Sequence, residues 1–195
     1  MSFQTNIVEV PAVVVTKMRV AAEDQVLKHS GQVGIYGHND PDPTITGYMG
    51  EYAVRQLYLT GGVDCHQNIN NDKMPDLSIF PHTSYDKCHC PISTKCHTKR
   101  EEEVKSWKAG YSWEQFGKTV RVEHAEKYAA KQRDRVWFCE VNRETNCVIV
   151  HGWASTTDIL QADIRNTPAA NHQLEVLRRV SEIMPWIDDK ETGWF

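Results

Sequence analysis

The sequence predicts a single α/β domain with a mixed central β-sheet flanked by helices. Segments of helical periodicity alternate along the chain with short apolar segments of strand character, and no internal repeat divides it. The 195 residues suffice for one well-filled core. Apolar residues make up 40% of the chain and charged residues 25%, an ordinary globular balance. We therefore interpret residues 1–195 as one domain.

The N-terminal part of the chain combines strand and helix signals. Residues 7–16 are apolar and β-branched, which favours strand, but Pro11 argues against one uninterrupted central strand. Residues 18–29 suit a short amphipathic helix. Two Asp-Pro pairs then disfavour helix before residue 44.

The middle of the chain predicts one helix and two strands around a polar insertion. Apolar residues at helical spacing indicate a helix from about Thr46 to Leu59. Residues 75–80 and 102–107 alternate between apolar and polar side chains, as strands do. Residues 81–100, which separate these strands, form a polar insertion rich in Cys and His.

The C-terminal half continues the alternation of elements. We expect a helix at 122–132, followed by two apolar strands at 135–142 and 146–154 that a short turn connects. A last helix is expected around 172–184, where apolar residues recur at helical spacing before Pro185.

Two carboxylates and an amine fall on the two middle strands. Asp76 begins the first strand directly after Pro75, and Glu103 and Lys105 lie two residues apart on the second. Because side chains alternate between the faces of a strand, Glu103 and Lys105 share a face. Buried unpaired charges there would cost roughly several kcal/mol each, and a bound divalent cation would remove that cost. The residue types therefore indicate a Mg²⁺-dependent site acting on phosphate.

These residues resemble the active-site signature of a known family. Pro75-Asp76, a spacer and Glu103-Val104-Lys105 are similar to the motif of the PD-(D/E)XK nuclease superfamily, which has a restriction-endonuclease-like core. Residues 47–53 resemble that family's first helix, in which a glutamate, here Glu51, often completes the metal site. The order of the helices and strands that follow Lys105 also fits the family.

The resemblance covers about residues 45–154, with residues 81–100 as the Cys/His-rich insertion and 155–195 as a C-terminal extension. The spacer between Asp76 and Glu103 departs from the family pattern because it is long and crowded with cysteines. If the register differs, Asp64 or Asp72 takes the place of Asp76. Gln115 resembles a polar residue that some members use near the site.

The resemblance implies a nuclease that hydrolyses phosphodiester bonds in DNA and leaves 5′-phosphate and 3′-hydroxyl ends. It implies that Asp76 and Glu103 bind Mg²⁺ or Mn²⁺, with the Val104 carbonyl as a third protein ligand. Lys105 would then position the attacking water, and Glu51 would support a metal-bound water.

Six cysteines raise the question of a second metal. Cys139 and Cys147 lie in apolar strand segments and are expected to be small core residues. A structural Zn²⁺ site is expected from the ligand types within the insertion, Cys88, Cys90, Cys96 and His97, with Cys65, His66 or His89 as replacements. The spacing is not the familiar C-x₂-C pairing, so a polar loop with reactive thiols is the open alternative.

The formal net charge of −4 argues against a protein that coats nucleic acid nonspecifically. A local basic strip can still dock DNA, with a solvated helix face as the alternative interpretation. Its members would be Lys118, Arg121, Lys127, Lys131, Arg133 and Arg135.

The expected location is cytoplasmic, or host-cytoplasmic for a phage or viral protein, because no signal peptide or membrane span is evident. DNA is the expected partner, RNA and a homodimer stay open, and no membrane is expected. The rival hypothesis is a noncatalytic, zinc-stabilised nucleic-acid-binding protein on the same fold. Substrate structure, recognition sequence and endo- or exonuclease mode are not determined by the sequence.

Overall fold

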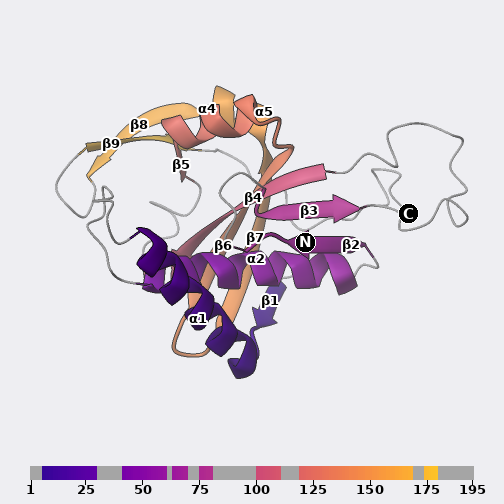
Figure 1. Ribbon diagram of the computed structural model, residues 1–195. Coiled ribbons are helices and arrows are strands. Elements are labelled where there is room, and N and C mark those ends of the chain that lie inside the picture. Colours follow the sequence, from indigo (N-terminus) through magenta and orange to yellow (C-terminus); the bar gives the residue numbers. More distant parts are fainter. Residues whose placement is uncertain are drawn as a thin grey trace, which may run out of the picture.

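Six strands in the order β1-β7-β6-β4-β3-β2 form the central sheet in the computed structural model (Figure 1). β4 and β6 are parallel, and every other neighbouring pair in this sheet is antiparallel. Three further strands form a small sheet in the order β5-β9-β8. The strands are β1 (Asn6–Glu9), β2 (Asp64–Gln67), β3 (Leu77–Phe80), β4 (Arg100–Lys108), β5 (Thr119–Arg121), β6 (Arg135–Asn142), β7 (Cys147–Ser155), β8 (Asp163–Pro168) and β9 (Leu174–Arg179).

The structure describes residues 6–29, 41–60, 63–69, 75–80, 100–110, 119–168 and 174–179. The Cys/His-rich insertion is therefore outside the described residues from 81 to 99, as are Asp72, Gln115 and Lys118. Of the helices in the described part of the chain, none has the length and apolar character needed to cross a membrane.

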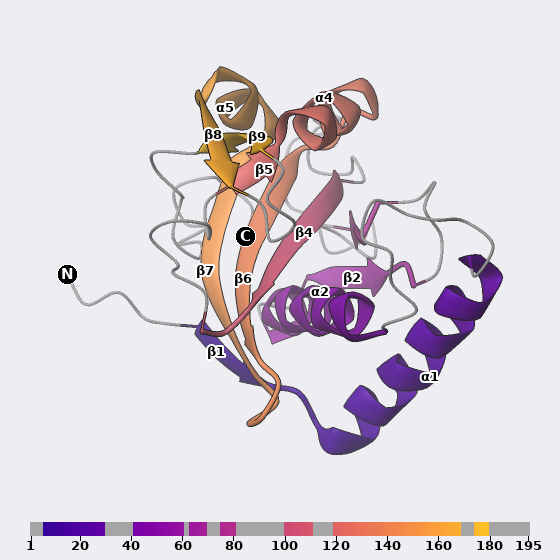
Figure 2. The same cartoon turned by 90° about the vertical axis from the view of Figure 1, so that its left-hand side faces the viewer.

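Helices cover both faces of the central sheet, as Figures 1 and 2 show. α2 (Asp42–Thr60) packs against one face, and α1 (Ala12–His29) packs on the outside of α2. α4 (Val122–Ala130) and α5 (Thr156–Gln161) lie together on the other side. Two hydrophobic clusters result, a large one between α2 and the sheet and a smaller one beneath α4 and α5. The mixed α/β architecture predicted from the sequence is confirmed.

The N-terminal segment differs from its prediction. β1 ends at Glu9, and the helix begins at Ala12 rather than at residue 18, so the β-branched residues 13–16 are helical. The carbonyl of Pro11 accepts hydrogen bonds from the amides of Val14 and Val15 at 2.8 and 3.1 Å, which closes the first turn. Proline suits this position because the first helical residues need no N–H donor.

The helix expected at 172–184 is wrong for residues 174–179, which form the strand β9. β9 pairs antiparallel with β8 along its length and with β5 at three positions. This pairing satisfies the backbone groups that a helix would have bonded within itself, so tertiary context outweighs the helical spacing of the apolar residues.

Close contact between α2 and β4 requires a glycine at position 50. A Cβ atom added to Gly50 would lie 1.9 Å from Oγ of Ser106 on β4. A larger side chain would require the Ser106 hydroxyl to rotate away and the neighbouring Cβ atom, 3.1 Å from the added one, to shift by a few tenths of an ångström. Gly50 therefore sets how near the next residue, Glu51, lies to the residues at the edge of β4.

Candidate active site

A cleft of about 410 Å³ opens at the edge of β4, between the layer of α1 and α2 and the helix α4. Its acidic lining residues are Glu51, Asp76 and Glu103, and Val104 lies among them. Lys105 also lines it. The four side chains that the sequence predicted for the metal-dependent site, from α2, the start of β3 and β4, thus line one cleft.

Pro75 explains why the cleft lies where it does. The pairing of β3 with β4 begins at Leu77, opposite Glu102, and continuing this register would place Pro75 opposite Val104. Pro75 has no N–H to donate to the Val104 carbonyl, so the ladder cannot continue. Instead, the Asp76 side chain accepts the Val104 N–H through Oδ2 at 2.7 Å. The Val104 carbonyl points to the same side of the strand as its N–H, which is the side of Asp76.

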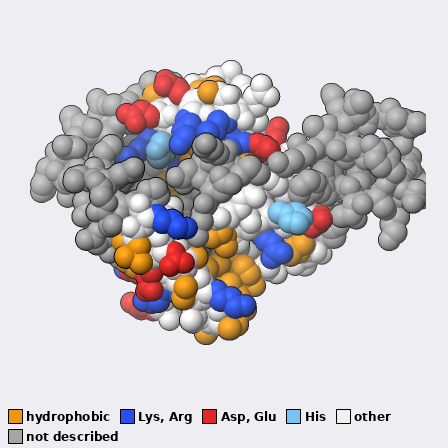
Figure 3. Space-filling model, in the orientation of Figure 1, with side chains coloured by type: hydrophobic (Ala, Val, Ile, Leu, Met, Phe, Trp, Pro, Cys, Tyr) orange, Lys and Arg blue, Asp and Glu red, His pale blue; other side chains and the backbone are white. Residues whose placement is uncertain are grey.

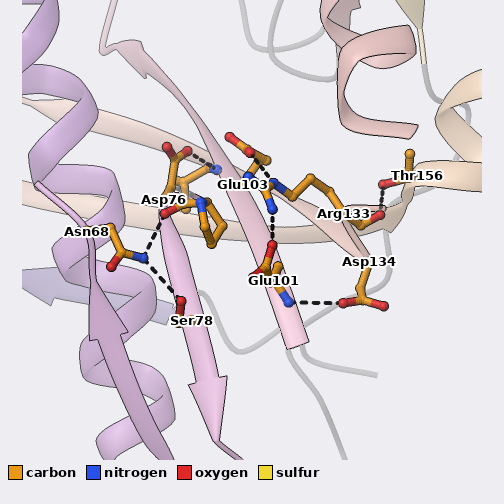
Figure 4. Close-up of polar contacts among 10 residues, drawn as sticks. Asn68, Asp76, Ser78, Glu101, Glu103, Arg133, Asp134 and Thr156 are labelled. Carbon is orange, nitrogen blue, oxygen red and sulfur yellow. Dashed lines mark hydrogen bonds and ion pairs between the residues drawn. The ribbon is translucent and has the colours of Figure 1, made fainter. Parts of the chain in front are cut away.

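Asn68 holds the segment that carries Asp76. Its backbone N–H donates to the Asp76 carbonyl at 3.0 Å, and its Nδ2 donates to the Pro75 carbonyl at 2.8 Å. Nδ2 also lies 3.2 Å from Oγ of Ser78 (Figure 4). These bonds fix the backbone on both sides of Asp76. No local sequence pattern singles out Asn68, because the hydrogen-bond partners of its Nδ2 lie seven and ten residues away.

Glu103 is paired with an arginine on the side away from Asp76. Its Oε1 accepts a hydrogen bond from Nε of Arg133 at 2.8 Å, and 8% of the residue is exposed. Burial, followed by the negative charge of Asp76, raises the pKa of Glu103 to about 7 even though Arg133 opposes the shift. The carboxyl group therefore carries an unfavourable charge at neutral pH in the absence of a further cation.

The other two carboxyl groups show the same imbalance. Burial raises the pKa of Glu51 well above its usual range, and the negative charges of Asp76 and Glu103 add to the shift. Gln67 donates to Oε2 of Glu51 at 2.9 Å, which offsets only part of it. Burial also raises the pKa of Asp76, although the Val104 N–H favours the ionised form. A cation between these groups would stabilise all three charges.

Lys105 lies beside these carboxylates in a half-buried position. Burial lowers the pKa of Lys105, while Asp76 and Glu103 act to raise it. Its Nζ lies 3.4 Å from Nδ1 of His124 and 5.4 Å from the centre of the Tyr128 ring. The sequence does not single out His124 as a site residue. His124 lies next to Lys105 because α4 packs opposite this part of β4.

The α4 wall of the cleft is basic. His124, Lys127 and Lys131 all line the cleft, since spacings of three and four residues put them on one face of the helix and of the turn that follows it. Figure 3 shows Lys, Arg and His side chains gathered at the level of α4, above the α1 and α2 layer. The opposite wall carries neutral polar side chains, among them Gln25 and Thr44.

The predicted basic strip is only partly realised. Lys127 and Lys131 line the cleft. Arg133 instead pairs with Glu101 and Glu103, and the Arg135 guanidinium stacks on Trp153 at 3.9 Å from the ring centre. Arg133 and Arg135 are therefore engaged in contacts within the protein and do not extend the basic wall of the cleft.

Of the two substitutes considered for Asp76, Asp64 can be compared with it directly, whereas Asp72 lies outside the described residues. Asp64 lies on β2 opposite Phe80, at the far end of β3 from Asp76, and forms an ion pair with His66 at 3.6 Å. Asp64 is not among the lining residues of the cleft. Of the two residues that can be located, Asp76 is the one placed beside Glu103.

The expected zinc ligands Cys88, Cys90, Cys96 and His97 lie outside the described residues, as does His89. Cys65, one of the possible replacement ligands, is described and lies in apolar surroundings. It is 1% exposed within the large hydrophobic cluster, where burial raises its pKa to about 12. A thiol so protected from ionisation is a poor zinc ligand. Cys139 is a buried core residue and Cys147 is half-buried, and both have free thiols.

No cluster of three or more His, Cys, Asp or Glu side chains with metal-binding geometry occurs among the described residues. The donor set at the cleft consists of the Asp76 and Glu103 carboxylates and the Val104 carbonyl. Mg²⁺ is commonly held by one or two carboxylates, with waters and substrate phosphate completing its shell. The donor set therefore fits Mg²⁺ or Mn²⁺ better than a metal that needs an all-protein cage.

Comparison of the chain with protein-family models and with curated protein sequences finds no match. The function is therefore argued from the geometry and chemistry of the cleft.

Proposed function

We propose that this protein is a metal-dependent nuclease that hydrolyses phosphodiester bonds in DNA, with Asp76, Glu103 and Lys105 at its centre. The observation that carries the proposal is that these three residues and Glu51 line one cleft, which lies beside β4 beyond the end of its pairing with β3. Burial raises the pKa values of all three carboxyl groups, and such a group of raised pKa values within a cleft is typical of a functional site.

The arrangement of elements around the cleft supports a restriction-endonuclease-like core. α2 carries Glu51, the β3–β4 pair carries Asp76, Glu103 and Lys105, and α4 connects β4 to its parallel neighbour β6. The same order underlies the resemblance to the PD-(D/E)XK superfamily. The fold assignment at this level is part of the proposal.

Asp76 and Glu103 would hold Mg²⁺ or Mn²⁺, and the Val104 carbonyl would be the third ligand. The cation would lower the pKa of a coordinated water and stabilise the charge that develops on the phosphate. Glu51 lies behind the two ligands and would accept a hydrogen bond from a water in the metal's coordination shell.

Lys105 would orient the attacking water and contact the scissile phosphate. Burial lowers the pKa of Lys105, and the charges of Asp76 and Glu103 oppose that shift. The basic wall formed by Lys127 and Lys131 would contact neighbouring phosphates of the same strand, which gives the bound nucleic acid a defined side.

The test is incubation of the purified protein with labelled linear, circular, nicked and forked DNA in Mg²⁺, Mn²⁺ or EDTA. We expect cleavage with either cation, none with EDTA, and loss of cleavage in Asp76→Asn. Asp64→Asn is the matched control because Asp64 lies away from the cleft on β2. A protein that binds these DNAs with no cleavage in either cation would support the rival, noncatalytic binding function. A parallel set of RNA substrates tests whether the preference is for DNA.

A further inference from the structure

Arg133 occupies a position between two glutamates of β4. Its residue is 5% exposed, its Nε donates to Oε1 of Glu103 at 2.8 Å, and its Nη1 pairs with Oε2 of Glu101. Figure 4 shows the guanidinium between these two side chains. Glu101 and Glu103 share a face of β4, so one planar group reaches both.

The backbone around Arg133 is fixed independently of its side chain. Its N–H donates to the Tyr128 carbonyl at 2.9 Å, and its carbonyl accepts from Oγ1 of Thr156 at 2.6 Å. The next residue, Asp134, exchanges bonds with Glu101, because the Glu101 N–H donates to Oδ2 of Asp134 at 3.0 Å and the Asp134 N–H donates to the Glu101 carbonyl at 2.9 Å. The backbone that carries the Arg133 side chain is thus held in place from α4, α5 and β4.

This arrangement restricts how Glu103 can bind a metal. Oε1 of Glu103 is committed to Arg133, which leaves Oε2 for a ligand in the cleft. Because Arg133 engages one lone pair of Oε1 and fixes the orientation of the carboxylate, binding through Oε2 alone is favoured over binding through both oxygens. Mg²⁺ demands near-ideal octahedral geometry at roughly 2.0–2.1 Å, whereas Ca²⁺ takes six to eight oxygens and often binds a carboxylate through both.

We propose that Arg133 is a specificity-determining residue for the metal, which favours Mg²⁺ over Ca²⁺ by holding Glu103 to single-oxygen binding. This inference rests on the proposed function, because it assumes that the metal binds at Asp76 and Glu103. Arg133 then affects the ratio of the Ca²⁺ affinity to the Mg²⁺ affinity. A variant that only unfolds, or that only loses a positive charge, would not change this ratio.

The experiment is calorimetric titration of the full-length protein, free of other metals, with Mg²⁺ and with Ca²⁺. Arg133→Met removes the positive charge and the planar guanidinium that bonds both glutamates. Arg133→Lys keeps the charge but replaces the guanidinium with one compact ammonium. Lys127→Met is the matched control, because it removes a cation that lines the cleft without a bond to Glu103. Thermal unfolding identifies any variant that fails to fold, in which case Arg133→Lys carries the test.

We expect the ratio of the Ca²⁺ to the Mg²⁺ dissociation constant to fall about tenfold in Arg133→Met and by a smaller factor in Arg133→Lys. Lys127→Met should change both constants equally and leave the ratio at its wild-type value. A wild-type ratio in both folded Arg133 variants, or an equal fall in Lys127→Met, would overturn the inference while leaving the metal site in place. A wild-type protein that binds neither ion would refute the metal site itself, and the inference with it.

Discussion

Glu102 and Glu103 are neighbours on β4, both are buried, and they have opposite surroundings. Glu102 is 0% exposed and faces α2, where its Oε2 accepts hydrogen bonds from the Tyr58 hydroxyl and the Trp137 indole. Arg100 and Arg135 lie within 4.0 Å of its other oxygen. Glu103 faces the cleft, where another carboxylate, Asp76, is one of its nearest charged groups.

The difference separates a structural buried charge from a binding group. The protein itself supplies two hydrogen-bond donors to Oε2 of Glu102 and two guanidinium groups near Oε1, and these cations compensate its buried charge even though Oε1 accepts no hydrogen bond. Glu103 has one arginine, shared with Glu101, and an adjacent negative charge, and Arg133 and Lys105 offset only part of the rise in its pKa. A carboxylate kept in such surroundings is typical of a site that binds a cation.

The largest effect is expected on the cleavage rate, from a substitution on the face of β4 that carries Glu103. Lys105→Ala should lower the cleavage rate at least about 100-fold, because the amine acts on the attacking water and the scissile phosphate. DNA binding should persist, since Lys127 and Lys131 remain. Single-turnover cleavage and fluorescence anisotropy measure the two effects separately. If binding and cleavage fall together, Lys105 has a docking role rather than a chemical one.

A substitution at Glu102, on the other face of β4, should instead lower the stability of the protein. Glu102→Ala leaves Arg100 and Arg135 without their buried partner, so the free energy of unfolding should fall by about 3–5 kcal/mol. Urea denaturation at neutral pH measures this loss. Glu103→Gln is the control, because it keeps an acceptor for Arg133 and should fold as well as the wild type. A Glu102→Ala protein of wild-type stability would show that the Glu102 network is not structural.

A smaller effect is expected on the pH dependence of stability. The pKa of Glu103 is about 7 in the folded protein against 4.5 for a free glutamate, so the metal-free fold binds its proton more tightly than the unfolded chain does. Stability from this group is full below about pH 4.5 and is lost as the pH rises through 7, by at most about 3 kcal/mol. Denaturation in EDTA between pH 5 and pH 8 measures the slope.

Glu103→Gln should flatten that slope, and Asp64→Asn should keep it. Saturating Mg²⁺ should recover the stability that the metal-free wild-type protein loses at pH 8, because Mg²⁺ binds the ionised carboxylates. An equal slope in wild type and Glu103→Gln would mean that another group dominates the titration.

The sequence was sufficient to predict the residues whose positions follow from strand geometry. The period of two places Glu103 and Lys105 on one face, and the strand expected at 75–80 corresponds to β3, which begins two residues later at Leu77. It was insufficient for residues that reach the cleft from distant segments. Arg133 lies 30 residues from Glu103, and His124 lies 19 residues from Lys105. No local pattern encodes contacts that depend on how α4 returns to the sheet.

The errors in secondary structure have the same origin. Residues 13–16 favour strand by propensity, yet packing of Val14, Val15 and Met18 against the large hydrophobic cluster stabilises a helix there. Residues 174–179 carry a helical spacing of apolar residues, yet pairing with β5 and β8 makes them a strand. In both segments a tertiary partner outweighs a local preference.

The most direct measurement of the central claim is the rate of DNA cleavage in Mg²⁺ by wild type, Glu103→Gln and Asp64→Asn under identical conditions. The account predicts that wild type and Asp64→Asn cleave at similar rates, that EDTA stops both, and that folded Glu103→Gln is at least about 100-fold slower. Cleavage that persists in EDTA, or a Glu103→Gln protein as active as the wild type, would contradict it.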